Sequence, residues 1–350
     1  MSTQFLPINK QEMDALGWDA PDFVYVTGDA YVDHPSFGVA IISRVLEDAG
    51  FRVAILSQPD YKSVTDFKRF GKPRLGFLVT SGNIDSMVAH YTAAKKKRSD
   101  DAYTPGGRAG ARPDRALTVY CNRIHEAYPK LPILIGGVEA SLRRFSHYDY
   151  WDDKVRRSIL FDAPADLLVY GMGEKATVEI ARRLSRKQDV RTITDVRGTA
   201  YITADKESCT FHSIDCPSYE AVCADKVDYA RANKIQYEEH DPIRGKAIIQ
   251  PCQGRYLVVN PPQMPLDSKG LDKVAEFPYA RWYHPMYEDM GVEKTAMKID
   301  GEKVGEVIMT FAKEGWDVTD PDAFEDFALD YGFAKIRRTI RPDMADSVIS

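Results

Sequence analysis

Cysteine is scarce in this sequence, with 5 among 350 residues, and none forms a C-x-x-C pair. Zinc and iron–sulfur sites usually include a close pair, because one tight turn holds two ligands at little ordering cost. Cys209, Cys216 and Cys223 follow one another at seven-residue intervals, but Pro217 interrupts any single helix that would align them. We therefore expect free thiols and no metal ligand, as in a reducing cytoplasm.

Long apolar runs and excess positive charge are also absent. No run approaches the roughly 18 apolar residues of a membrane-spanning helix. The N-terminal stretch MSTQFLPINKQEMDALGW lacks the basic region and apolar core of a secretory signal. The net charge of −5 gives no reason to expect nucleic acid or anionic lipid as a partner. We expect a cytoplasmic protein without a membrane partner, large enough for one large core or two moderate ones.

What is present in the first half is an alternation of short apolar segments with amphipathic ones. The apolar segments predict strands at residues 23–26, 52–56, 75–79, 133–135 and 167–170. The amphipathic ones predict helices at residues 37–49, 64–70, 84–97, 114–128 and 174–184. This alternation predicts an α/β fold, a doubly wound and mostly parallel sheet, for which a flavodoxin-like strand order is our expectation.

The second half has a different pattern, so we place a domain boundary near residue 203. Residues 1–203 form the expected flavodoxin-like domain, and residues 204–287 a linker and a smaller α+β module with a helix at 217–232 and a strand at 247–250. Residues 288–350 stay unassigned. Within them we expect a hairpin at 295–311 around Asp300-Gly301 and a helix that begins after Asp320.

Four of the five predicted strands are followed by a loop that contains both glycine and a carboxylate. These loops read TGDAYVDHPSFG (27–38), TSGNID (80–85), GGVEASLRR (136–144) and GMGE (171–174). Because parallel strands end at one edge of a sheet, the loops predict a shared pocket for a small-molecule ligand. The alternative is that each glycine serves only to turn the chain. The candidate pocket residues are Asp29, Asp33, His34, Ser36, Ser81, Gly82, Asn83, Gly136, Gly137, Glu139, Arg143, Arg144, Gly171, Gly173 and Glu174.

The common nucleotide and hydrolase motifs are not found in these loops. None reads G-x-x-x-x-G-K-[ST], G-x-G-x-x-G or G-x-S-x-G. The segment 142–159 is rich in arginine and aromatic residues, which suits ligand stacking, anion binding or a domain interface. It also suits a surface of paired charges, since Asp152 and Asp153 precede Arg156 and Arg157 at helical salt-bridge spacing. The basic run 95–98 predicts a solvated loop, and a nucleic-acid role is unlikely.

Several stretches resemble the N-terminal half of the YgiQ-type radical SAM protein family. They include VTGDAYVDHPSFG, DDAYTPGGRAGARPDRA, GGVEASLRRFSHYDYWDDKVRRSIL, GMGEKATVEIA, DVRGTAYI, RYLVVNPPQMPL and FPYARWYHPMY. The resemblance covers about residues 13–287. It implies an N-terminal domain similar to cobalamin-binding domains, followed by a barrel that binds a 4Fe–4S cluster through C-x-x-x-C-x-x-C. That cluster cleaves S-adenosylmethionine reductively, and the substrate is not established for the family as a whole.

The sequence departs from the family where the cluster motif is expected. After the segment YHPMY the chain reads EDMGVEKTAMKIDGEKVGEVIMTF, with no cysteine after Cys252. We therefore expect neither cluster nor S-adenosylmethionine chemistry from this chain alone. Cobalamin is not expected either, because Asp33 and His34 are adjacent and do not form D-x-H-x-x-G. His34 could ligate a metal or anchor its loop by a hydrogen bond.

Two functions remain open from the sequence. The chain is either the N-terminal part of a radical SAM enzyme that works with a barrel in cis or in trans, or a stand-alone ligand-binding or regulatory module. Acid–base chemistry by Asp29, Asp33, His34 and Glu139 is a third and weaker alternative, because nothing in the sequence fixes their geometry. Catalytic residues cannot be named from the sequence.

Overall fold

The computed structural model of the chain describes residues 5–290 and divides into two units. The larger unit contains Met1–Thr104 and Arg108–His284, and the smaller one Pro105–Gly107 and Pro285–Ser350. In the smaller unit the described residues form two 3-10 helices, η2 (Pro105–Gly107) and η5 (Pro285–Met290).

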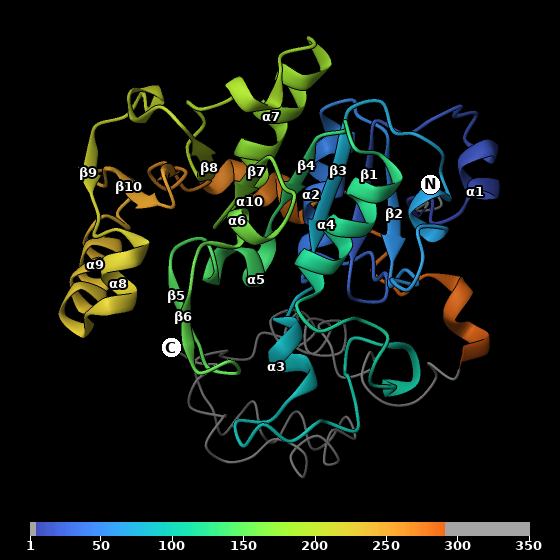
Figure 1. Cartoon of the computed structure of the whole chain (residues 1–350). Coiled ribbons are helices and arrows are strands. Elements are labelled where there is room, and N and C mark those ends of the chain that lie inside the picture. The colour runs from blue at the N-terminus through green and yellow to red at the C-terminus, as the bar shows by residue number, and fades with distance from the viewer. Residues whose placement is uncertain (1–4, 291–350) are drawn as a thin grey trace, which may run out of the picture. The chain divides into compact units, whose positions relative to one another are not determined.

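A nine-stranded mixed sheet organises the larger unit, in the order β2-β1-β3-β4-β7-β8-β11-β10-β9 (Figure 1). The first five strands in that order are parallel to one another. β8, β11 and β10 then continue antiparallel, and the edge strand β9 is parallel to β10. A separate two-stranded antiparallel sheet pairs β5 with β6. The predicted α/β class with a mostly parallel sheet is therefore confirmed for the first half of the chain.

All the described strands are short, and those of the parallel part of the sheet are mostly apolar, as the sequence pattern predicts. They are β1 (Phe23–Thr27), β2 (Val53–Ser57), β3 (Gly76–Thr80), β4 (Ile133–Ile135), β5 (His147–Asp149), β6 (Lys154–Arg156), β7 (Leu167–Val169), β8 (Thr199–Thr203), β9 (Ser213–Asp215), β10 (Ala247–Cys252) and β11 (Arg255–Val259). Every residue of β1, β3 and β4 is buried, which is typical of parallel strands covered on both faces.

The helices connect these strands and cover both faces of the sheet. They are α1 (Lys10–Ala15), α2 (Gly38–Asp48), α3 (Ser86–His90), α4 (Ala116–Ala127), α5 (Gly137–Leu142), α6 (Ile159–Asp162), α7 (Glu174–Ser185), α8 (Tyr219–Ala224), α9 (Lys226–Glu238) and α10 (Ser268–Ala275), with 3-10 turns η1 (Asp66–Lys68), η3 (Val190–Thr192) and η4 (Lys206–Ser208). Among these described helices, each is too short or too polar to span a lipid bilayer.

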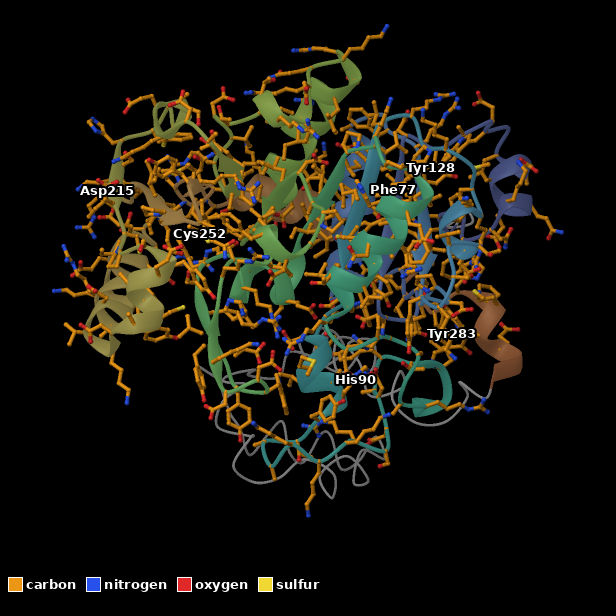
Figure 2. All side chains as sticks on the ribbon, viewed as in Figure 1. Phe77, His90, Tyr128, Asp215, Cys252 and Tyr283 are labelled. Carbon is orange, nitrogen blue, oxygen red and sulfur yellow. The ribbon has the colours of Figure 1, made fainter. Side chains whose placement is uncertain are left out.

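Alternate residues of the parallel strands face different helices. α2 and α7 pack against each other on one face, whereas α4 packs on β3 and β4 and lies in front of the parallel strands in Figure 1. Figure 2 labels Phe77 on β3 and Tyr128 at the end of α4, whose rings stack with centroids 5.8 Å apart. Burial of such apolar side chains on both faces is the main favourable term in folding.

Some predicted helices are wrong in extent. The helix expected at 64–70 is only the 3-10 turn η1, and the one expected at 84–97 ends at His90. The chain turns back after His90, where Tyr91 bridges to Lys97. The helix expected at 217–232 is broken at Asp225, whose side chain accepts a hydrogen bond from Val227 N and so begins α9.

The structure also contains a helix that the sequence pattern does not predict, and it leaves some predictions untested. The loop 136–144 contains α5, which was not predicted. β8 ends at Thr203, and β9, β10 and β11, which follow it in the chain, belong to the same sheet. The domain boundary near residue 203 stays a prediction. The hairpin expected at 295–311 and the helix expected after Asp320 lie outside the described residues.

Candidate functional site

A cleft of about 290 Å³ opens at the carboxyl edge of the parallel strands. Its floor includes Tyr25, Leu78 and Leu134, which lie in register on β1, β3 and β4. Successive side chains of a strand point to opposite faces, so these three share the face that α2 and α7 cover. The floor of the cleft is therefore apolar and continuous across three strands.

The cleft lies where the order of the strands reverses. From β1 the chain passes through α2 to β2 on one side, whereas β3 pairs with the other side of β1. Open α/β sheets bind their ligands at such a point. Thr27 and Thr80, the last residues of β1 and β3, line the cleft there and give its edge two hydroxyl groups.

The four glycine-containing loops do converge on this cleft. Eight of the fifteen predicted pocket residues line it: Asp29, Gly82, Asn83, Gly136, Gly137, Gly171, Gly173 and Glu174. The other seven are not among its lining residues: Asp33, His34, Ser36, Ser81, Glu139, Arg143 and Arg144. The proximity of the loops is thus observed, while a ligand for them stays a prediction.

Sequence reasoning missed the walls of the cleft. Besides the floor, the lining includes Gly38, Val39, Ile41, Ile42, Val79, Ile135, Val138, Val169, Met172 and Thr177. Six of these ten lie near the first turns of α2, α5 and α7, three belong to β3, β4 and β7, and Met172 belongs to the loop before α7. A signal existed, because the residues just after each strand-end loop begin the helices that face the same edge.

Two glycines allow the loops to approach closely. A Cβ added at Gly82, where φ is +109°, would overlap the Asp29 carboxylate. A Cβ at Gly137, where φ is +83°, would overlap the Thr80 hydroxyl. Both positions combine a positive φ with no room for a side chain, so their glycines are required by packing as well as by backbone conformation.

A buried arginine, Arg112, connects the loops behind the cleft. Its side chain is completely buried, its Nε lies 2.9 Å from Asp101 Oδ2, and its Nη2 lies 2.9 Å from Asp29 Oδ1. Nη2 also donates to Asp101 Oδ1 at 3.0 Å, and Nη1 donates to the Ser81 carbonyl oxygen at 2.8 Å. One guanidinium therefore holds together the loops after β1 and β3 and the segment before α4. No sequence pattern around Arg112 predicts this role.

Asp29 belongs both to this network and to the cleft lining. Burial raises the pKa of Asp29 to about 6, although the Arg112 guanidinium acts in the opposite direction. The backbone N–H of Asn83 donates to Asp29 Oδ2 at 2.6 Å. Asp29 is therefore a buried carboxyl group at the edge of the cleft whose pKa lies above its ordinary value.

Asp33 connects α2 to residues 280–282, near the C-terminal end of the larger unit. Its carboxylate forms a buried ion pair with Arg44 of α2 and accepts a hydrogen bond from Ala280 N at 2.9 Å. Its own backbone pairs with Arg281 N at 2.8 Å and with the Trp282 carbonyl oxygen at 3.0 Å. These partners occupy Asp33 fully, which explains why it does not line the cleft.

Glu139 is likewise a buried carboxylate that holds neighbouring segments of the chain together. Its two oxygens accept hydrogen bonds from Ser86 N at 2.9 Å and Leu117 N at 3.2 Å, at the starts of α3 and α4. Burial raises the pKa of Glu139, and the negative charge of Asp85 raises it further. Asp85 itself pairs with Arg143. Two predicted pocket residues, Glu139 and Arg143, therefore fix helix ends beside the cleft.

The polar loop after β1 is held by its own side chains. Ser36 N donates to His34 Nδ1 at 3.1 Å, so His34 makes the loop-anchoring hydrogen bond that was the alternative to metal ligation. Asn83 Nδ2 donates to the Ser36 carbonyl oxygen at 3.1 Å, and Asn83 Oδ1 accepts from Gly38 N at 3.4 Å. Asn83 thus caps the start of α2.

The arginine-rich segment 142–159 is a surface of paired charges on a hairpin. Arg156 lies 3.0 Å from Asp152, as its spacing predicts, but the segment forms β5 and β6 and not a helix. Arg157 pairs with Asp162 at 2.7 Å, so the predicted pairing with Asp153 is wrong.

Arg144 stacks above the ring of Tyr170, with its guanidinium carbon 4.8 Å from the ring centroid. Burial lowers the pKa of Arg144. Its Nη1 donates to the Ser141 carbonyl oxygen at 2.6 Å. Arg144 is therefore engaged with its neighbours and does not supply a cation to the cleft.

The thiols do not provide a cluster site. Cys121, Cys216 and Cys252 are buried, Cys209 is half-buried and Cys223 is exposed. Burial raises the pKa of Cys216 to about 12, which disfavours the thiolate that binds metal. Within residues 5–290 no three His, Cys, Asp or Glu side chains are placed to hold a metal ion. The residues of this chain therefore do not fit a 4Fe–4S cluster held by three closely spaced thiolates.

Comparison with known proteins identifies the family. Residues 5–299 match the family model described as radical SAM N-terminal. The chain is 58% identical over 287 residues to a UPF0313 protein of Clostridium botulinum and 56% identical over 288 residues to one of Clostridium perfringens. These alignments cover 82% of this chain and 44% of each relative, so the chain spans less than half the length of these relatives. The resemblance seen in residues 13–287 is confirmed, and the chain belongs to the radical SAM N-terminal family.

Proposed function

We propose that this chain is the ligand-holding part of a YgiQ-type radical SAM protein, and that its cleft binds a small molecule. The observation that carries the proposal is the convergence of four strand-end loops on one cleft at the reversal of strand order. An apolar floor with a few polar groups at the rim is the usual composition of a small-molecule site.

The buried ion pairs and hydrogen bonds behind the four loops support this proposal. Buried ion pairs and helix caps made by Arg112, Asp33 and Glu139 fix the loops from behind. Groups that are held before a ligand arrives cost less ordering entropy on binding. The cleft is therefore preorganised by residues that do not themselves contact the ligand.

The strand order supports a flavodoxin-like domain. β2-β1-β3-β4-β7 becomes 2-1-3-4-5 when these five strands are numbered among themselves. We do not propose cobalamin as the ligand, because the D-x-H-x-x-G pattern is absent and His34, the candidate axial ligand, does not line the cleft. The expected domains, residues 1–203 and 204–287, are kept as part of this proposal.

Radical chemistry is proposed only for a complete protein. The family implies a 4Fe–4S cluster and S-adenosylmethionine, but the residues of this chain do not fit the cluster. The cluster would therefore be carried by a barrel in cis or in trans, and the cleft would hold a substrate or accessory ligand for it. The alternative is a stand-alone ligand-binding or regulatory module without redox chemistry.

Equilibrium dialysis against a small-molecule extract, followed by mass spectrometry, tests the proposal. Val138 lies at the cleft and is 45% exposed, so Val138→Trp should block the cleft without disturbing the core. Val88 on α3 is 46% exposed and is not a lining residue, which makes Val88→Trp a matched control. We expect a compound retained by the unmodified chain and by Val88→Trp, but not by Val138→Trp. Equal retention by all three would refute the cleft as the site.

The nucleotide sequence after codon 280 separates the two alternatives. A C-x-x-x-C-x-x-C motif in any frame, or in an adjacent gene for a partner chain, supports the radical SAM arrangement. Its absence from both, together with a retained compound, would favour the stand-alone module.

A further inference from the structure

We propose that the cleft takes an uncharged, flat molecule with polar edge groups, and that it rejects the phosphorylated form of the same molecule. This inference rests on the proposed function, since it names the class of ligand for the same cleft. It follows from the charged side chains that line the cleft, from the polar groups at the N-termini of the helices around it and from the shape of its floor.

The charged side chains that line the cleft, among residues 5–290, are the carboxylates Asp29 and Glu174. The guanidinium of Arg112 lies behind Asp29 but is shared between Asp29 and Asp101. One positive charge between two carboxylates leaves this network negative whenever both are ionised. A phosphate entering the cleft would therefore meet negative charge at its edge.

Helix N-termini commonly bind anions, and α2 and α7 both begin at this cleft. Neither N-cap residue makes a side-chain capping hydrogen bond, but another polar group of the chain lies at each end. Asn83 Oδ1 accepts the hydrogen bond of Gly38 N at the start of α2. Glu174 places a carboxylate in the first turn of α7, where it offsets the helix dipole. The positive end of each helix is therefore partly offset from within the chain.

The shape of the cleft suits one flat ring system. Tyr25, Leu78 and Leu134 lie side by side on adjacent strands, which are spaced about 4.8 Å apart in a sheet. The helices α2 and α7 supply the facing walls through residues such as Ile42 and Thr177. A volume of about 290 Å³ lies at the low end for small-molecule sites, so it admits one ring system and little more.

The polar groups at the edge suit hydrogen-bonding ring substituents. Thr27 Oγ1 accepts from Asp29 N at 3.2 Å, and Thr80 Oγ1 accepts from Gly82 N at 3.2 Å and donates to the Gly82 carbonyl oxygen at 3.4 Å. Each hydroxyl oxygen can accept one further hydrogen bond. Asp29 Oδ1 is buried and accepts no hydrogen bond of good geometry from the described residues, although it lies 2.9 Å from Arg112 Nη2. A ligand with N–H and C=O groups along one edge is the chemistry that this arrangement can recognise.

Matched pairs of probes test the inference directly. Riboflavin and flavin mononucleotide differ by one phosphate, as do adenosine and adenosine monophosphate. Isothermal titration of the full chain at pH 7.5 and low salt should give at least tenfold tighter binding of the uncharged member of a pair. Because the discrimination is electrostatic, Glu174→Gln and added salt should both reduce the ratio.

Controls locate the binding and separate the two proposals. Val138→Trp should abolish binding of the uncharged probe, and Val88→Trp should preserve it. Tighter binding of the phosphorylated member, again abolished by Val138→Trp, would overturn this inference and leave the proposed function standing. If no probe binds, the dialysis experiment described above separates the two proposals. Retention of a phosphorylated compound would overturn only this inference, and retention of an uncharged flat compound would support it. If no compound is retained, both proposals are overturned.

Discussion

Replacement of Arg112 by methionine tests whether the buried network holds the cleft together. Arg112 is completely buried and serves two carboxylates and the Ser81 carbonyl oxygen at once. Methionine keeps an unbranched chain of similar length but removes every donor. Asp29 and Asp101, both buried, would then lose the charge that balances them.

The expected loss of stability is large. Removing one partner of a buried ion pair costs about 3–5 kcal/mol, because the other charge is left without compensation. Arg112 also donates to a backbone carbonyl, so we expect a value of about 5 kcal/mol, near the upper end. For a unit of this size roughly 2 °C of melting temperature corresponds to 1 kcal/mol, so Arg112→Met should melt about 10 °C lower.

The loss should shrink as the pH falls. In the native protein the pKa of Asp29 is already raised to about 6 by burial, and Arg112 lowers it. Without Arg112 that pKa rises further, whereas in the unfolded chain it is about 3.8. A group whose folded pKa is raised binds more protons in the folded state, so folding gains stability as the pH falls toward the unfolded value. The deficit at pH 5 should therefore be smaller than at pH 7.5.

Calorimetry at both pH values measures this effect against a matched surface control. Arg74 is 44% exposed and pairs with Asp19, so Arg74→Met should cost less than about 1 kcal/mol at either pH. The triple variant Asp29→Asn, Asp101→Asn, Arg112→Met should recover part of the loss, since no unpaired charge remains. A cost for Arg112→Met as small as that of Arg74→Met, or one independent of pH, would refute the reasoning.

Three further predictions use the same denaturation measurements. Gly82→Ala should cost about 2 kcal/mol or more, because it adds backbone strain at φ +109° and an overlap with a buried carboxylate, whereas Gly38→Ala, with open space around it, should be close to neutral. Glu139→Gln should abolish the part of the stability gain on acidification that comes from the raised pKa of Glu139; an unchanged pH profile would contradict this. Asp33→Asn should cost about 3 kcal/mol, because it removes one of the two carboxylates that pair with the buried Arg44 and leaves only Glu47, which lies 2.7 Å away and is 42% exposed; it should leave ligand retention in dialysis unchanged, and lost retention at full stability would instead assign Asp33 to the cleft.

The parallel part of the sheet could be predicted because its strands are almost entirely buried. β1, β3 and β4 read as continuous apolar runs, and each predicted strand agrees with the observed one to within one residue at either end. α5 could not be predicted, because six residues give too few positions to show a helical period, and its first residue, Gly137, has a positive φ.

The site could be predicted only as far as topology determines it. The loops at the ends of parallel strands meet wherever the sheet is parallel, so their convergence follows from the strand pattern alone. Which loop carboxylate faces the cleft depends on distant partners. Asp33 forms an ion pair with Arg44 of α2, and Glu139 accepts hydrogen bonds from the backbone at the starts of α3 and α4. Neither carboxylate lines the cleft.

The same partners explain why some carboxylates face the cleft and others do not. Asp33 and Glu139 are buried, accept hydrogen bonds on both oxygens from the chain itself and do not line the cleft. Asp29 shares its arginine with Asp101 and retains one oxygen without a well-oriented donor among the described residues. Incomplete satisfaction of a buried polar group costs stability, so it is tolerated where another molecule can supply the missing donor. We therefore expect Asp29, among these three carboxylates, to be the one that a ligand of the proposed cleft would contact.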